Sequence, residues 1–132
     1  MRILIADDNR DAADTLAMVL RFWGHEVRAV YDGISALQAA RSFKPHAALL
    51  DIEMPYVNGG DVALDLRRQS GSEGIFILAL SANEPDDPRL ARYGGAFDAF
   101  LSKPCDLDYL AELLARRHSG STIRWEQRST SG

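Results

Sequence analysis

The chain of 132 residues is 46% hydrophobic and 26% charged and carries a net charge of −4, which predicts one folded domain with a substantial core. It lacks the basic surplus of nucleic-acid-binding domains, and its single cysteine, Cys105, excludes an internal disulfide and a cysteine-based zinc site. It has no signal peptide and no apolar run of about 18 residues, so we expect a cytoplasmic location without contact with a membrane.

The first two elements are a short apolar strand and an amphipathic helix. Residues 2–6 form an apolar run that stops at Asp7 and Asp8, so we expect a strand with two acids at its carboxyl end. Either Asp8 or Asn9 suits the N-cap of the following helix, and Gly24 ends it. The helix carries one apolar stripe, made of Ala13, Leu16, Ala17 and Leu20.

A second strand and helix follow, and a third strand then leads into an acid. Residues 26–30 predict the strand, and the helix is expected to bury one side, with Ile34, Leu37 and Ala40. Residues 47–50 are apolar without interruption and end at Asp51, which is typical of a strand covered on both faces of a sheet. Asp51 then lies where open α/β sheets bind ligands, although this stretch alone fits a residue that only ends the strand.

The next helix and strand repeat the pattern. The helix begins at Gly59 and Gly60 and buries one face, with Val62, Ala63 and Leu66. We expect Arg67 and Arg68 at its end to be solvated. Residues 75–80 predict a fourth buried strand, which ends at Ser81.

The last third of the chain is less regular. We expect a short helix near Pro88, a brief strand over residues 99–101, and a final helix with one apolar stripe, made of Leu107, Leu110, Ala111 and Leu114. Residues 119–132 are polar and indicate a flexible tail or linker. Ile123 and Trp125 leave weak docking and disorder equally open for that segment.

Five strands alternating with five helices predict an α/β fold, a doubly wound five-stranded parallel sheet with helices on both faces. The carboxyl ends of parallel strands meet at one edge of the sheet. Polar residues that follow different strands should therefore gather there, although they lie far apart in the chain: Asp7, Asp8, Asp51, Ser81 and Lys103.

These residues predict a metal-dependent phosphoryl site. Carboxylates about 4 Å apart repel each other by about 4 kcal/mol per pair at an effective dielectric of about 20, so a cation should join the three acids. Oxygen ligands favour Mg²⁺, with Mn²⁺ as a substitute, over Ca²⁺, which needs more protein oxygens. We expect the backbone carbonyl of Glu53 as a further ligand and leave the role of its side chain open. Lys103 and Ser81 suit two oxygens of a phosphoryl group, and Asp51 is the candidate nucleophile.

Residues 1–118 resemble the receiver domain of two-component response regulators, with 119–132 as the tail or linker. The family's acid pair, phosphorylated aspartate, glycine, Ser-Ala and Lys-Pro motifs correspond in order to Asp7 and Asp8, Asp51, Gly59, Ser81-Ala82 and Lys103-Pro104. The intervals of 30 residues from Asp51 to Ser81 and 22 from Ser81 to Lys103 are also those of the family.

The resemblance implies a flavodoxin-like (βα)5 fold with strand order 2-1-3-4-5 and a cis bond between Lys103 and Pro104. It implies Mg²⁺-dependent phosphoryl transfer from a histidine kinase or histidine phosphotransfer protein to Asp51, followed by hydrolysis. Such a chain is a signalling module that catalyses its own phosphorylation and dephosphorylation, rather than an enzyme. Ser81 and Phe100 would form the switch toward an unknown downstream protein. We expect Glu53 and Asn83 to tune the lifetime of the phosphorylated form.

Two departures from the family pattern concern the switch. Phe100 replaces the frequent tyrosine, so no phenolic hydrogen bond holds its inward state. The helix near Pro88 is short, and Gly95 lies one residue further from Lys103 than usual. We therefore expect a dimer through the face formed by that helix, the fifth strand and the last helix to be weak or absent.

Other functions are compatible with parts of the sequence. The receiver could belong to a hybrid kinase or shuttle phosphate in a phosphorelay, or act as a scaffold only. An aspartyl-phosphate phosphatase is a remote alternative, because its nucleophile usually follows the first strand. Ordinary surface or packing roles are expected for the remaining reactive or aromatic residues, His25, His46, His118, Cys105 and Trp23.

Overall fold

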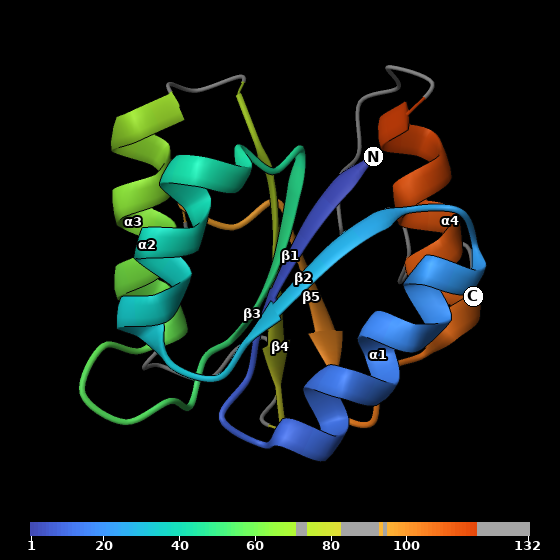
Figure 1. Cartoon of the computed structure of the whole chain (residues 1–132), viewed down its shortest axis with the longest axis horizontal. Coiled ribbons are helices and arrows are strands. Elements are labelled where there is room, and N and C mark those ends of the chain that lie inside the picture. Colours follow the sequence, from blue (N-terminus) through green and yellow to red (C-terminus); the bar gives the residue numbers. More distant parts are fainter. Residues whose placement is uncertain (71–73, 83–92, 94, 119–132) are drawn as a thin grey trace.

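The computed structural model describes residues 1–70, 74–82, 93 and 95–118, which form five strands and four helices (Figure 1). The strands are β1 (Arg2–Ala6), β2 (Glu26–Val30), β3 (Ala47–Asp51), β4 (Phe76–Ser81) and β5 (Ala99–Ser102). The helices are α1 (Arg10–Phe22), α2 (Gly33–Phe43), α3 (Gly59–Ser70) and α4 (Leu107–His118). The short helix expected near Pro88 falls outside the described residues.

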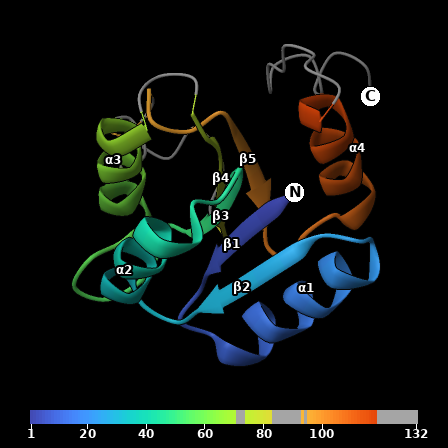
Figure 2. The ribbon, with the colours of Figure 1, turned by 45° about the horizontal axis from the view of Figure 1, so that its top comes forward.

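The strands form one parallel sheet in the order β2-β1-β3-β4-β5, which confirms the doubly wound, flavodoxin-like fold. Helices α2 and α3 cover one face, and α1 and α4 cover the other (Figure 2). Alternate residues of the central strands enter the two cores: Leu4 and Leu50 pack toward α2 and α3, whereas Ile5 and Leu49 pack toward α1 and α4. Among the described residues no helix has the length and apolar character needed to cross a bilayer.

Side-chain caps fix the starts of the four described helices at the carboxyl edge of the sheet, and at α4 the side chain of Asp106 accepts the N–H of Tyr109 at 3.1 Å. The side chain of Asn9 accepts a hydrogen bond from the backbone N–H of Ala12 at 3.1 Å, which selects Asn9 over Asp8 as the cap of α1. Asp32 caps α2 in the same way. Asn58 accepts from the N–H of Asp61 at 2.9 Å at the start of α3. These caps hold the helix starts beside the strand ends.

Two predicted helix faces were wrong at one residue each, although Leu37 and Ala40 of α2 and Leu110 and Leu114 of α4 contact the core as expected. Ile34 is 56% exposed, and α2 instead buries the stripe that contains Ala36, Ala39, Ala40 and Phe43. The reason is local: a Cβ on Gly33 would lie 2.1 Å from the backbone oxygen of Val57, so the glycine side of α2 must face that loop. In α4, Leu107 is 39% exposed and Leu113 takes its place in the core.

Arg67 is not a solvated helix end, contrary to expectation. Its guanidinium donates to the backbone oxygens of Ile75 at 2.8 Å and Ala96 at 3.2 Å, and it pairs with the carboxylate of Asp98 at 2.6 Å. The same carboxylate oxygen of Asp98 accepts the N–H of Ile77 at 2.8 Å. One arginine therefore ties α3 to the start of β4 and to the chain that enters β5.

Candidate functional site

Three acids and one lysine meet at the carboxyl edge of the sheet. Asp7 and Asp8 follow β1, Asp51 ends β3, and Lys103 follows β5. The Nζ atom of Lys103 lies 3.0 Å from Oδ2 of Asp7 and 3.0 Å from Oδ2 of Asp51. One oxygen from each of the three acids lies within 4.8 Å of the other two. The parallel topology thus brings together residues that the sequence separates by up to 96 positions, counted from Asp7 to Lys103.

The backbone fixes the two buried carboxylates. Asp7 and Asp51 are each only 2% exposed, whereas Asp8 is exposed. Oδ1 of Asp7 accepts the N–H of Asn9 at 3.0 Å, and Oδ1 of Asp51 accepts the N–H of Glu53 at 3.0 Å. Each carboxylate therefore has one oxygen held by the backbone and the other directed at Lys103. This arrangement leaves little freedom for either side chain to reorient.

Burial dominates the electrostatics of Asp51. It raises the pKa of Asp51 to about 6, assisted by the neighbouring Asp7, while the Glu53 N–H and Lys103 oppose the rise. Burial by itself lowers the pKa of Lys103, but the hydrogen bonds and charges of Asp51 and Asp7 outweigh it and raise that pKa above its ordinary value. At neutral pH the site therefore holds an ionised lysine between the side chains of Asp7 and Asp51.

The other predicted site residues lie close by, with one exception. Ser81 ends β4, is 3% exposed and pairs with Ser102 in the sheet, and its backbone oxygen accepts the N–H of Lys103 at 2.9 Å. The Glu53 side chain is exposed, and its backbone N–H is the group that donates to Asp51. The bond between Lys103 and Pro104 is cis, as the resemblance implies. Asn83 lies outside the described residues.

Phe100 of β5 is half-buried against the core that α2 and α3 cover. Its ring packs on that of Phe97, with centroids 5.7 Å apart and planes at 51°. Phe97 itself is 7% exposed. The position expected to act as the switch therefore lies against a second buried aromatic ring, which the sequence reasoning did not single out.

Comparison with known proteins agrees with this geometry. Residues 3–115 match the model of the response regulator receiver domain family. The chain belongs to this family. It is 38% identical over 116 residues to the response regulator MprA of Mycobacterium avium. That match covers 88% of this chain and 49% of the relative. MprA of Mycobacterium tuberculosis strain H37Rv is 36% identical over the same length. The chain thus spans about half the length of these curated relatives.

Solved receiver structures share the fold. The response regulator TrrA of Thermotoga maritima, solved in complex with Mg²⁺ and BeF, matches with a TM-score of 0.75 at 27% identity, over 87% of this chain and 96% of that one. The chemotaxis protein CheY4 of Vibrio cholerae matches with a TM-score of 0.77 at 26% identity, over the same shares of the two chains. These matches show that the fold of this chain is shared by solved receiver domains.

Glycines let the loop after β3 fold closely over the end of that strand. A Cβ on Gly59 would lie 2.3 Å from the backbone oxygen of Asp51, and one on Gly60 would lie 2.4 Å from the ring of Tyr93. The Tyr93 hydroxyl lies 3.4 Å from both the Asn58 amide and the Asp61 carboxylate. Sequence reasoning missed this contact with Tyr93; the adjacent glycines were the signal that another group approaches.

A cavity of about 580 Å³ adjoins the receiver site between α1 and the start of α4. Asp7 and Lys103 line its polar end, and Leu16, Pro104 and Cys105 line its apolar part. Burial, with a smaller effect of the Asp106 charge, raises the pKa of Cys105 to about 11. The thiol is therefore protonated at neutral pH, which argues against thiolate chemistry at this site.

Proposed function

We propose that Asp51 is the phosphoacceptor of this receiver domain and that its phosphorylation switches the binding of a downstream protein. The observation that carries the proposal is the placement of Lys103, 3.0 Å from both a buried Asp51 and a buried Asp7. A cation shared by two buried acids is already in position for the oxygens of an incoming phosphoryl group. The phosphodonor is a histidine kinase or a histidine phosphotransfer protein.

The same acids fit a hard divalent cation. Their three oxygens lie within 4.8 Å of one another, and no nitrogen or sulfur ligand accompanies them among the described residues of that cluster. Carboxylates of Asp7, Asp8 and Asp51, with the backbone carbonyl of Glu53, would hold Mg²⁺, or Mn²⁺ in its place. Mg²⁺ would neutralise negative charge on the phosphoryl oxygens and on the carboxylates. The Mg²⁺ and BeF in the TrrA complex support this assignment.

In the proposed reaction the phosphoryl group becomes covalently bonded to Asp51. A carboxylate oxygen of Asp51 attacks the phosphorus of a phosphohistidine, the P–N bond breaks, and its electron pair stays on the imidazole nitrogen, which then takes a proton. Lys103 exchanges its contact with Asp51 for a phosphoryl oxygen, and the Ser81 hydroxyl donates to another oxygen. In hydrolysis a water oxygen attacks the phosphorus, the P–O bond to Asp51 breaks, and inorganic phosphate leaves. Glu53 and Asn83 tune the rate of that hydrolysis.

Ser81 and Phe100 transmit the change. When Ser81 moves toward the phosphoryl group, Phe100 turns into the space beside it, which alters the surface of β5 and its neighbours. The buried ring of Phe97, packed against Phe100, has to accommodate this movement. The output is a protein partner, without direct contact of residues 1–118 with nucleic acid or membrane. A dimer through this face is weak or absent.

Because the chain spans about half the length of its curated relatives, the receiver domain could also be part of a larger signalling protein, such as a hybrid kinase, or could pass phosphate on in a phosphorelay. An aspartyl-phosphate phosphatase is not favoured, since the buried acid at the centre of the site follows β3 rather than β1.

The test is phosphorylation by acetyl phosphate with Mg²⁺, followed by the mass of the intact protein. We expect one phosphoryl group on the native chain, labile to base and to hydroxylamine, and none without Mg²⁺ or in Asp51→Asn. Asp108→Asn is the matched control, because Asp108 is an exposed acid in the first turn of α4, and it should behave like the native chain. A phosphoryl group retained by Asp51→Asn refutes the proposal.

A further inference from the structure

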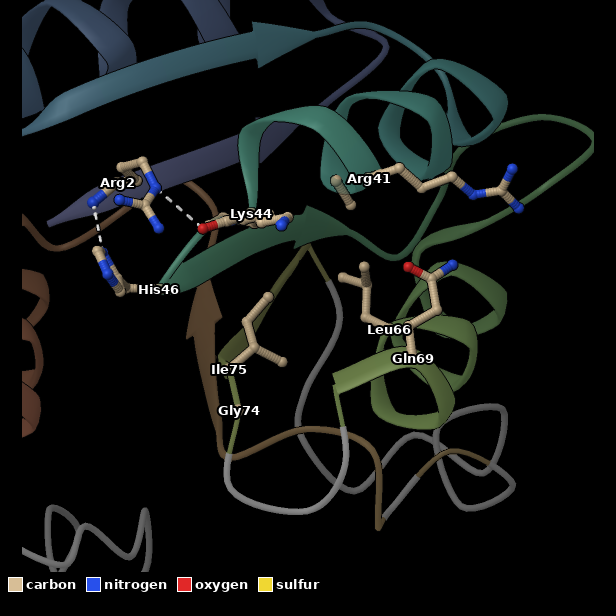
Figure 3. Close-up of a pocket in the computed structure, with 10 residues that line it drawn as sticks. Arg2, Arg41, Lys44, His46, Leu66, Gln69, Gly74 and Ile75 are labelled. Carbon is tan, nitrogen blue, oxygen red and sulfur yellow. Dashed lines mark hydrogen bonds between the residues drawn. The ribbon is translucent and has the colours of Figure 1, made fainter.

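Two histidines flank the first residues of β1 at the amino edge of the sheet. His25 directly precedes β2 and His46 directly precedes β3, the two strands that pair with β1. Nδ1 of His46 accepts the backbone N–H of Arg2 at 2.8 Å (Figure 3). Nδ1 of His25 lies 3.3 Å from the amino nitrogen of Met1. The start of β1 is therefore held by a ring nitrogen on each side.

His46 contacts both backbone polar groups of Arg2. Its own N–H donates to the Arg2 oxygen at 2.8 Å, while its ring accepts the Arg2 N–H. The paired residues of β1 and β3 begin with Ile3 and Ala47, so these contacts lie one step beyond that ladder. There the imidazole supplies an acceptor to a backbone N–H at the edge of the sheet.

The Arg2 side chain extends this contact to α2. Its Nε donates to the backbone oxygens of Phe43 at 2.9 Å and Lys44 at 3.0 Å, which are the last residue and the C-cap of that helix. The last carbonyls of a helix have no partner within the helix, so Arg2 satisfies two of them. The residue that His46 holds therefore joins β1 to the end of α2.

The hydrogen bond from Arg2 requires a neutral ring at position 46. An imidazolium carries a hydrogen on each ring nitrogen and cannot accept. In the neutral ring Nδ1 is the acceptor, so the proton lies on Nε2. Burial, and then the charges of Arg2 and the amino terminus, lower the pKa of His46. The ring is therefore neutral at pH 7 and gains a proton only in more acidic solution.

Cations line the surface around His46. Two hollows adjoin the ring, one of about 480 Å³ and one of about 320 Å³. No acid among the described residues lines either hollow, and the charged groups come from β1, the end of α2 and α4: the amino terminus of Met1, Arg2, Arg41, Lys44 and Arg117. Figure 3 shows the Arg41 side chain directed away from the ring. A proton on His46 would therefore add positive charge beside cations and gain no counter-charge there.

We propose that His46 is an acid-sensitive latch on the amino end of β1: the neutral ring holds Arg2, and protonation of the ring releases Arg2 and loosens its contact with the end of α2. The side chain of His46 is exposed, so protons reach it without a conformational change. Because the folded pKa of His46 lies below the unfolded value, the stabilisation from the latch is complete above about pH 6.5 and is lost as the pH falls through the folded value. The latch lies at the edge opposite Asp51, so it does not depend on phosphorylation there.

The test is hydrogen exchange of the Arg2 amide, followed by NMR on the full chain from about pH 7.5 to about pH 5. The rate is expressed as a protection factor, which removes the intrinsic effect of pH on exchange. We expect the protection of Arg2 to fall about fivefold as His46 titrates. Leu49, in the centre of β3, reports global unfolding, and its protection should not fall with that of Arg2.

Two variants of His46 separate the acceptor from the titration. His46→Gln offers an amide oxygen at any pH, so the protection of Arg2 should stay constant over the range. His46→Leu offers no acceptor, and the protection should be low throughout. His25→Gln is the matched control on the other side of β1, and in it Arg2 should respond to pH as in the native chain.

The nitrogen chemical shifts of the His46 ring give a second readout. We expect a neutral ring with its proton on Nε2, and a titration below the ordinary value of about 6.5. Four results overturn the proposal: protection of Arg2 that does not change as His46 titrates, the native pH response in His46→Gln, loss of that response in His25→Gln, or a neutral ring with its proton on Nδ1.

Discussion

At the carboxyl edge of the sheet two acids are buried and paired with one lysine, whereas at the amino edge the two cations at the end of α2 are exposed and have no ion-pair partner among the described residues. Asp7 and Asp51 are each 2% exposed and share Lys103. Arg41 and Lys44 are exposed, and no acid among the described residues pairs with either. Both edges belong to one sheet, so the difference lies in local burial rather than in topology.

The direction of the helices explains the sign of the charge at each edge of the sheet, but it does not explain why the charged groups at one edge are reactive. Helices begin at the carboxyl edge with acids in their first turns and end at the amino edge with cations in their last turns, as in α1 and α3. That pattern complements the helix dipoles and is common to exposed helix ends. The burial of Asp51 beside Asp7 goes beyond this pattern, because burial raises the pKa of Asp51 to about 6. The comparison teaches that a reactive charged group is recognised by its burial and by a counter-charge that it shares with a second group, not by the sign of its charge.

The largest effect should follow from Lys103→Met. Two buried carboxylates would lose their common counter-charge, and an incoming phosphoryl group would lose a preorganised cation. We expect the rate of phosphorylation by acetyl phosphate to fall about 100- to 1,000-fold. Lys44→Met is the control from the other edge, and its rate should stay within about twofold of the native value. Equal losses in the two variants would remove the distinction between the edges.

Arg67→Ala should cause the largest loss of stability. It would leave the carboxylate of Asp98 and two backbone oxygens without their charged donor. We expect the free energy of unfolding in urea to fall by about 2 to 3 kcal/mol. Arg68→Ala, at the exposed neighbouring position, should change it by less than about 0.5 kcal/mol. Similar values for both would show that the contacts of Arg67 contribute nothing at this amino-edge helix end.

Gly59→Ala should disturb the acidic edge through the backbone. The new Cβ would lie 2.3 Å from the backbone oxygen of Asp51, so the loop or the end of β3 must shift. We expect a loss of about 2 kcal/mol in unfolding free energy and slower phosphorylation. Among the described residues a Cβ on Gly95 meets no atom within 4 Å, so Gly95→Ala should be close to neutral in both measurements. A Gly59 variant that keeps the native rate would mean that the end of β3 tolerates displacement.

Asp51→Asn should stabilise the metal-free domain. Burial raises the folded pKa of Asp51 to about 6, above its unfolded value, so the folded state retains the proton more strongly. The stability contributed by this group is therefore highest below about pH 4, falls as the pH rises to about 6, and is constant above. Near pH 7 without Mg²⁺ we expect the variant to gain about 1 kcal/mol in urea unfolding. Mg²⁺ should stabilise the native chain more than the variant, and the reverse order would contradict the assignment.

The smallest effect is expected from Arg41→Gln/Lys44→Gln. Relief of like-charge repulsion between positions three residues apart opposes the lost interaction with the end of α2. We therefore expect the free energy of unfolding to change by less than about 0.5 kcal/mol and phosphorylation to be unaffected. Urea unfolding at low and high salt checks this. A large loss would show that these cations are structural.

Much of the fold and the acidic site was predictable because both depend on local patterns and on one rule of topology. Continuous apolar runs marked the buried strands, and parallel strands then had to bring Asp7, Asp51 and Lys103 to one edge. Asn9 was one of the two residues predicted as the N-cap of α1, because short polar residues before an apolar stripe are typical of helix starts.

Long-range side-chain contacts were not predictable from those patterns. Arg67 has the sequence context of a solvated helix end, and only the fold brings it to Asp98, 31 residues away. The face of α2 was misjudged at Ile34, because its rotation depends on how closely Gly33 approaches Val57 in another loop. The packing of Phe97 on Phe100 depends in the same way on the exact path into β5.

The most direct test of the site formed by Asp7, Asp51 and Lys103 is a crystal structure of the chain with Mg²⁺ and beryllofluoride. We predict beryllium bonded to a carboxylate oxygen of Asp51, with the Lys103 ammonium and the Ser81 hydroxyl each contacting a fluorine, and Mg²⁺ bound by the neighbouring acids. Beryllofluoride on another residue, or a Lys103 side chain that stays on Asp7 and does not contact the adduct, would contradict the account.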